Sequence, residues 1–166
     1  MEPTITNAIN DQANHELFSA LCYQALAYWC EDREFNGYAD FFKQQADEER
    51  LHADMFFRHL LDRDVKPMVA AIAAPKNDFA TLREVTEYAQ SLEYANSKQI
   101  QACYELSLEA KDYASQPFLL EFIKEQVEEE AWTNKMVTLT RRAECSGSVY
   151  SLDRHIVREL VDTPAE

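Results

Sequence analysis

Apolar side chains recur at helical spacing along four long stretches of the chain, with scarcely a glycine or proline inside them. In the first stretch, for example, Ile9, Ala13 and Ala20 fall on one side of a helix with 3.6 residues per turn. The pattern therefore predicts four long helices, at residues 7–34, 38–62, 81–109 and 115–142.

The segments between these stretches indicate how the helices are connected. Asn36-Gly37 predicts a tight stop after the first helix, so that the second returns antiparallel to it. Residues 63–80, which contain two prolines, predict an extended crossover of about 60 Å, enough to pass the whole length of a 25-residue helix. We expect an all-α four-helix bundle of two hairpins joined by one long crossover, plus a short C-terminal fifth helix over 150–160, as a single domain over 1–166.

Polar side chains interrupt the apolar stripe of each long helix. Two of the helices carry a pair three residues apart, which places both members of the pair on the same face. The interruptions are Glu16 in the first helix, Glu49 and His52 in the second, Glu93 in the third, and Gln126 and Glu129 in the fourth. One glutamate on an amphipathic helix is usually a solvent-facing flank, but the same feature on four successive helices indicates a common buried site.

The chemistry of this predicted site follows from its charge. Burying several ionised carboxylates together is costly unless they are protonated or neutralised by a bound metal. Two divalent cations would balance four carboxylates, and oxygen-rich ligation with one imidazole suits iron or manganese better than structural zinc. The residues thus favour an asymmetric di-iron carboxylate site, with Glu-x-x-His on one helix and Gln-x-x-Glu on another.

The composition narrows the range of partners. The 166 residues carry 16 basic and 30 acidic side chains, a net charge of −14, which disfavours nucleic acid and membrane surfaces and favours cations. The four cysteines form no CxxC pair, which is typical of a reducing compartment. The chain also lacks a basic N-terminal leader and any apolar run long enough to cross a membrane, so we expect a cytoplasmic protein.

At the level of motifs, the sequence resembles the non-haem bacterial ferritins. The similarity covers nearly the whole chain and rests on Asn14-His15-Glu16-Leu17 with Tyr23, on Glu48-Glu49-Arg50-Leu51-His52-Ala53, and on Glu125-Gln126-Val127-Glu128-Glu129-Glu130. The tail from Tyr150 to His155 is similar to the terminal helix of ferritins. The resemblance implies a homo-oligomeric cage of 24 subunits that stores iron, and a ferroxidase that oxidises Fe²⁺ with O₂ or peroxide to Fe³⁺.

The resemblance also implies a role for individual residues. One iron would be held by Glu16, Glu49 and His52, and Glu49 would bridge to a second iron held by Glu93 and Glu129. A third iron site on the inner surface is matched by Glu48, Glu125 and Glu128. At the paired site, Gln126 matches a close polar neighbour and Tyr23 matches an electron donor.

Departures from related families restrict this interpretation. Haem-binding relatives have a methionine after the bridging glutamate and a second Glu-x-x-His, whereas this chain has Arg50 and Gln126-x-x-Glu129, so we expect no haem. Two alternatives stay open at this point. One is a di-iron oxidase or peroxidase that stores nothing and needs no cage, and the other is a helical scaffold whose acidic residues only solubilise it.

Overall fold

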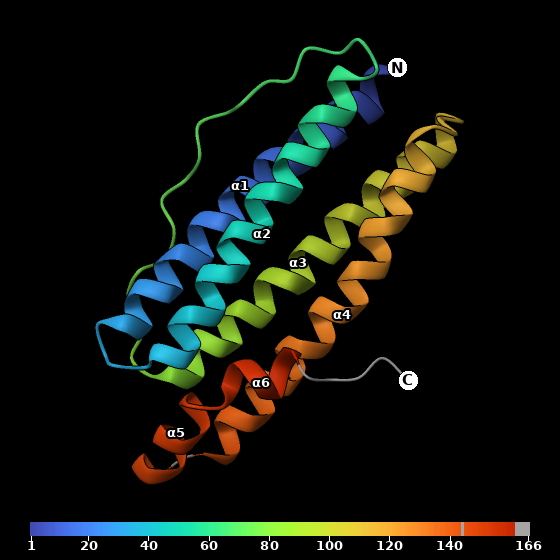
Figure 1. The fold of residues 1–166 in the computed structure, drawn as a ribbon. Coiled ribbons are helices and arrows are strands. Elements are labelled where there is room, and N and C mark those ends of the chain that lie inside the picture. The colour runs from blue at the N-terminus through green and yellow to red at the C-terminus, as the bar shows by residue number, and fades with distance from the viewer. Residues whose placement is uncertain (144, 162–166) are drawn as a thin grey trace.

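The computed structural model describes residues 1–143 and 145–161, which form a four-helix bundle with two short helices at its C-terminal end (Figure 1). This confirms the predicted fold class. The helices are α1 (Pro3–Glu31), α2 (Asn36–Leu61), α3 (Leu82–Glu109), α4 (Ser115–Arg142), α5 (Ser146–Asp153) and α6 (Ile156–Val161). The prediction of one domain over 1–166 also includes residues 144 and 162–166, which lie outside the described residues.

The largest differences from the predicted helices are at the two ends of the chain. The first helix begins at Pro3 instead of residue 7, because proline is compatible with the first turn and the Glu2 carboxylate caps it by accepting from the Thr4 N–H. The single helix predicted at 150–160 is two helices, since Arg154 and His155 form a turn between α5 and α6.

The connection between α1 and α2 uses a different residue from the one predicted as the stop. After α1, Glu34 adopts a left-handed conformation with φ of 61°, and the Phe35 N–H bonds the Cys30 carbonyl at 2.9 Å. Gly37 instead lies in the first turn of α2, where a Cβ would come within 1.8 Å of the Asp153 carbonyl oxygen. Glycine is needed at this position for the close approach of α5, not to end a helix.

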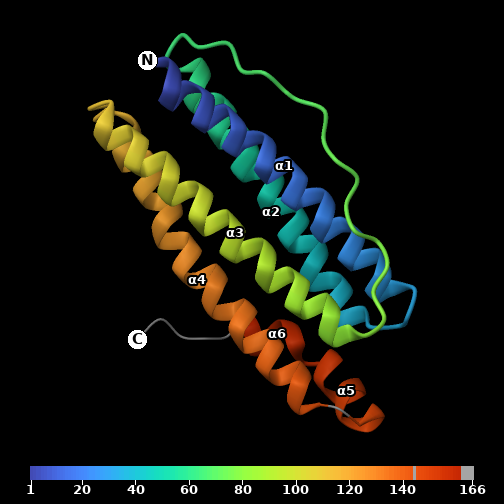
Figure 2. The ribbon, with the colours of Figure 1, turned by 180° about the vertical axis from the view of Figure 1, so that it is seen from behind.

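The crossover between α2 and α3 runs the length of the bundle on the outside of α1 (Figures 1 and 2). Two asparagines of α1 bind its backbone as a neighbouring strand would. The Asn10 side chain accepts from the Met68 N–H at 2.7 Å and donates to its carbonyl at 3.0 Å, and Asn14 accepts from the Ala70 N–H at 2.7 Å. These bonds satisfy backbone groups of a segment that has no regular secondary structure of its own.

The third helix begins with a capping arrangement that the sequence encodes locally. Thr81 accepts a hydrogen bond from the Glu84 N–H at 3.2 Å, and the Glu84 carboxylate accepts in return from the Ala80 N–H at 3.0 Å. This fixes where α3 starts after the crossover, and so fixes the level at which the side chains of α3 enter the core.

The apolar core is divided into two clusters. One cluster, which contains Tyr23, Phe42 and Met136, lies toward α5 and α6, and the other contains Ile9, Phe56 and Phe122. Between them is a layer of buried polar side chains drawn from all four long helices: Gln12, Glu16, Ser19, Gln45, Glu49, His52, Glu93, Asn96, Ser97, Gln126, Glu129 and Thr133. Such a layer is costly in a protein interior unless its groups have partners.

Candidate metal centre

Three ligand-type side chains meet in the middle of the bundle. Glu16 of α1 and both Glu49 and His52 of α2 place one ligand atom each within 4.8 Å of the others. His52 Nδ1 lies 3.6 Å from Glu49 Oε2, and the Glu49 oxygen has no hydrogen-bond partner. All three side chains are buried, and together they offer a cation two carboxylates and one imidazole as ligands.

Glu93 of α3 and Glu129 of α4 supply the other half of the predicted site. Both are buried, and the charge of each acts on Glu49. They are not part of the tight group around Glu16, and each carboxylate accepts a hydrogen bond from a neighbouring donor. The Tyr23 hydroxyl donates to Glu93, and the Trp132 indole N–H donates to Glu129.

Each buried carboxyl group of the cluster has a raised pKa. Burial is the largest cause in each case, and it raises the pKa of Glu16 and Glu49 well above normal and raises that of Glu93 as well. Burial and then the charge of Glu93 raise the pKa of Glu129 to about 9. A divalent cation that binds here therefore displaces protons from these carboxyl groups.

His52 connects the buried trio to a second acidic group. Its Nε2 lies 3.2 Å from Glu125 Oε1, and Glu48, His52 and Glu125 form a second set of ligand atoms within 4.8 Å of one another. Burial lowers the pKa of His52, but the hydrogen bond and charge of Glu125 outweigh it and the pKa is raised. Glu128 is exposed and is not part of this set.

Gln126 and Tyr23 both lie against Glu93. The Gln126 side-chain amide donates to the Glu93 carboxylate at 3.2 Å and to the Ser97 hydroxyl at 3.2 Å. The fully buried Tyr23 has its pKa raised well above the usual tyrosine value, first by burial and then by the charge of Glu93. Both residues thus lie at the cluster, in direct contact with one of its carboxylates.

Three residues that contact the cluster were not predicted from the sequence. The Gln12 amide donates to Glu16 at 2.7 Å, the Asn96 amide donates to Glu16 at 3.2 Å, and Trp132 donates to Glu129. Each lies three or four residues from one of the predicted acids on the same helix, a spacing that places it on the same face. That spacing was the available signal, but many residues share it and most of them have no such contact.

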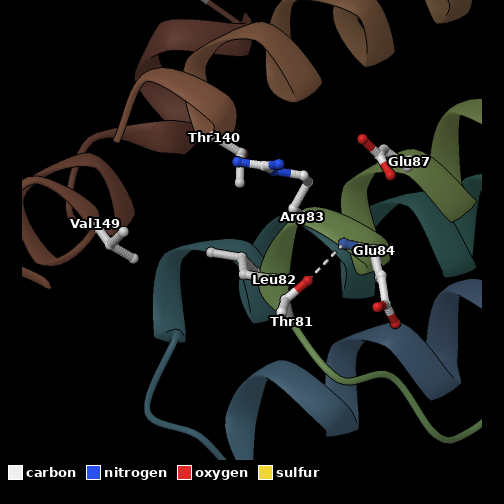
Figure 3. A pocket seen from close by; sticks show the side chains of 7 residues that line it. All are labelled: Thr81, Leu82, Arg83, Glu84, Glu87, Thr140 and Val149. Atoms are coloured by element: carbon white, nitrogen blue, oxygen red, sulfur yellow. Dashed lines mark hydrogen bonds between the residues drawn. The ribbon is translucent and has the colours of Figure 1, made fainter. Parts of the chain in front are cut away.

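The surface pocket in Figure 3 is separate from the cluster. It lies where α3 begins, and its walls come from Thr81, Leu82, Arg83, Glu84, Glu87, Thr140 and Val149. None of these residues contributes to the buried carboxylates, and Glu87 is paired with Arg141 at 2.8 Å.

In the described part of the chain, no helix is long and apolar enough to cross a membrane.

The chain is similar to known proteins over nearly its whole length. A family model for the ferritin-like domain matches residues 6–143. A bacterial non-heme ferritin of Staphylococcus aureus is 35% identical over 163 residues, 98% of each chain, and one of Staphylococcus saprophyticus is 33% identical over 159 residues, 95% of each. The open pore ferritin of the archaeon Archaeoglobus fulgidus superposes with a TM-score of 0.92 at 26% identity, covering 94% of this chain and 96% of that one.

Proposed function

This chain belongs to the ferritin-like domain family, and we propose that it is an iron-storage ferritin of the bacterial non-haem type, with ferroxidase activity at the buried cluster. The observation that carries the proposal is the buried Glu16–Glu49–His52 trio at the centre of a ferritin fold. Apolar side chains would stabilise the core better than this buried trio does. A bound divalent cation, in contrast, neutralises the charge of the trio.

We propose that Glu16, Glu49 and His52 hold one Fe²⁺ and that Glu49 bridges to a second Fe²⁺ held by Glu93 and Glu129. In support, all five side chains are buried in one polar layer between two apolar clusters. Four carboxylates balance the charge of two divalent ions. The hydrogen bond from His52 to Glu125 leaves Nδ1, the nitrogen that faces Glu49, available as the metal ligand.

The proposed reaction takes Fe²⁺ as its substrate. Two Fe²⁺ ions supply two electrons, the number that reduces O₂ to hydrogen peroxide or peroxide to water, so a paired site delivers both electrons to one oxidant molecule. The carboxylates release their protons when iron binds and stabilise the higher charge of Fe³⁺. Gln126 and Tyr23 keep Glu93 oriented through their hydrogen bonds.

We further propose an inner iron site formed by Glu48, Glu125 and Glu128, which receives Fe³⁺ on its way to a mineral in the hollow interior of a 24-subunit homo-oligomeric cage. Glu48 and Glu125 already lie together beside His52, at the partly exposed edge of the cluster. Glu128 would have to turn toward them. Two variants, Glu48→Gln and Glu125→Gln, should lower the iron bound per subunit before mineralisation from three to two.

The experiment that tests the proposed function is an anaerobic Fe²⁺ titration followed by stopped-flow mixing with O₂, on protein sized by light scattering. We expect a large cage, a fast phase of oxidation that saturates at two or three iron atoms per subunit, and subsequent growth of a mineral. Glu16→Ala and His52→Ala should abolish the fast phase and leave the cage intact.

Two results would contradict the proposal. Unchanged initial rates in both variants would place the oxidation elsewhere. A small oligomer that oxidises two irons per subunit without forming a mineral would identify the protein as a non-storage di-iron oxidase or peroxidase on the same bundle.

A further inference from the structure

Two buried amide side chains hold the carboxylate of Glu16 from both sides. The Gln12 Nε2 donates to Glu16 Oε1 at 2.7 Å, and the Asn96 Nδ2 donates to Glu16 Oε2 at 3.2 Å. The two amides are also joined, because Gln12 Nε2 donates to Asn96 Oδ1 at 2.6 Å. All three side chains are at most 1% exposed, so water does not substitute for these bonds.

The orientation of Gln12 is informative because it leaves one of its own atoms unsatisfied. Its Oε1 is buried and has no hydrogen-bond partner. Reversing the amide would offer that oxygen a different environment, but it would also turn the oxygen toward Glu16 and Asn96 Oδ1, two acceptors that repel it. The Gln12 oxygen thus stays without a hydrogen bond while the Gln12 N–H donates to Glu16. This indicates that the Glu16 carboxylate determines the orientation of the Gln12 amide.

The two amides come from different helices, and this ties the ligands together. Gln12 precedes Glu16 by one helical turn on α1, and Asn96 follows Glu93 by one turn on α3. The bond between Gln12 and Asn96 therefore fixes the Glu16 carboxylate relative to the helix that supplies Glu93.

We propose that Gln12 and Asn96 are positioning residues that fix the plane of the Glu16 carboxylate for the metal it binds, an inference that rests on the proposed function. Each carboxylate oxygen has two lone pairs, so an amide on each oxygen leaves one lone pair per oxygen for the metal. The amides cannot release a proton or compete as anionic ligands. They restrict the orientation of the carboxylate and leave its charge intact.

The consequence is a selective effect on the first metal. Loss of a group that orients a ligand typically weakens metal binding by about 10–100-fold. The loss should fall on the ion held by Glu16, Glu49 and His52. The ion held by Glu93 and Glu129 should be affected less, because Tyr23, Gln126 and Trp132 orient those carboxylates.

The test is an anaerobic titration of the assembled, metal-free protein with Co²⁺ alone, with the visible d–d absorption recorded at each addition. Gln12→Met and Asn96→Leu remove the donors while nearly conserving side-chain volume. Ser19→Ala is the matched control, because Ser19 is equally buried on α1 and its hydroxyl has no partner. Gln12→Asn keeps an amide on a side chain that is one methylene shorter. It replaces a donor variant that does not assemble.

We expect the two donor variants, and Gln12→Asn, to weaken Co²⁺ binding at Glu16, Glu49 and His52 by about 10–100-fold and to change the absorption bands of that ion, with Ser19→Ala matching the wild type. Unchanged affinity and bands in the donor variants would overturn the inference. Equal weakening in Ser19→Ala would also overturn it, since it would indicate a general packing effect. A wild-type protein that binds no Co²⁺ at the cluster would instead refute the proposed function itself.

Discussion

Replacing Glu129 by glutamine should make the stability of the metal-free protein less dependent on pH. Glu129 has a pKa of about 9 in the folded protein, against about 4.3 for an unperturbed glutamate. A group whose pKa is raised on folding stabilises the protein at low pH, and that stabilisation is lost as the pH rises toward the folded value. Glutamine has the shape of the neutral carboxyl group but carries no proton that titrates.

The magnitude follows from the proton retained by the folded state. Between pH 6 and pH 8, Glu129 is protonated in the folded protein and ionised in the unfolded chain, so the unfolding free energy falls by about 1.4 kcal/mol per pH unit. Over these two units the wild type should lose about 2.7 kcal/mol more stability than Glu129→Gln. The variant should retain the bond from Trp132, because a glutamine oxygen can accept it.

The assay is urea unfolding of both proteins in EDTA at pH 6, 7 and 8, followed by circular dichroism. The two stability curves should diverge as the pH rises, with the variant the more stable of the two at pH 8. Adding Zn²⁺ to the wild type should reverse the trend, because metal binding displaces protons and strengthens with pH. Parallel curves in EDTA would refute the reasoning, since Glu129 would then be ionised in both states.

Three further predictions concern other parts of the molecule. Gly37→Ala should destabilise the protein by about 1–3 kcal/mol, because the added Cβ collides with the Asp153 carbonyl. Calorimetry should show a lower melting temperature; an unchanged melting temperature would contradict the close approach of α5 to Gly37. Asp112→Asn should cost about 1–3 kcal/mol at pH 7, because burial raises the pKa of Asp112 but the hydrogen bonds from Arg63, one of them at 2.9 Å, outweigh burial and lower it. The stabilisation from a lowered pKa is complete above the unfolded value and is lost as the pH falls through the folded value, so the difference in urea titrations should shrink as the pH falls below about 4. Tyr23→Phe should weaken Co²⁺ binding at Glu93 and Glu129, because Glu93 loses the hydroxyl that orients it, and should leave binding at Glu16, Glu49 and His52 intact. It should also abolish any tyrosyl radical signal that freeze-quenched samples with substoichiometric iron show in electron paramagnetic resonance; a persisting signal would exclude Tyr23 as the electron donor.

The sequence was sufficient to predict the bundle and the acids at its centre because both depend on periodicity. Apolar side chains at helical spacing define the inner faces, and a charged residue on an inner face stands out against them. The positions of Glu16, Glu49, His52, Glu93 and Glu129 in one buried layer follow from that pattern once the helices pair antiparallel.

The remaining features depend on contacts that periodicity does not encode. Asn36-Gly37 has the composition of a helix stop, yet Gly37 is needed because α5, more than a hundred residues later, packs against it. Gln12 and Trp132 are ordinary helix residues in sequence, and only the packing of the helices brings their donors onto carboxylates. The break between α5 and α6 has no glycine or proline to mark it.

Anomalous diffraction at the iron absorption edge tests most directly whether five buried side chains hold two iron ions. Crystals soaked anaerobically in Fe²⁺ should show two anomalous peaks per subunit between the four long helices. One peak should contact Glu16, Glu49 and His52, and the other should contact Glu49, Glu93 and Glu129. Iron confined to the surface, with no peak in this layer, would contradict the account.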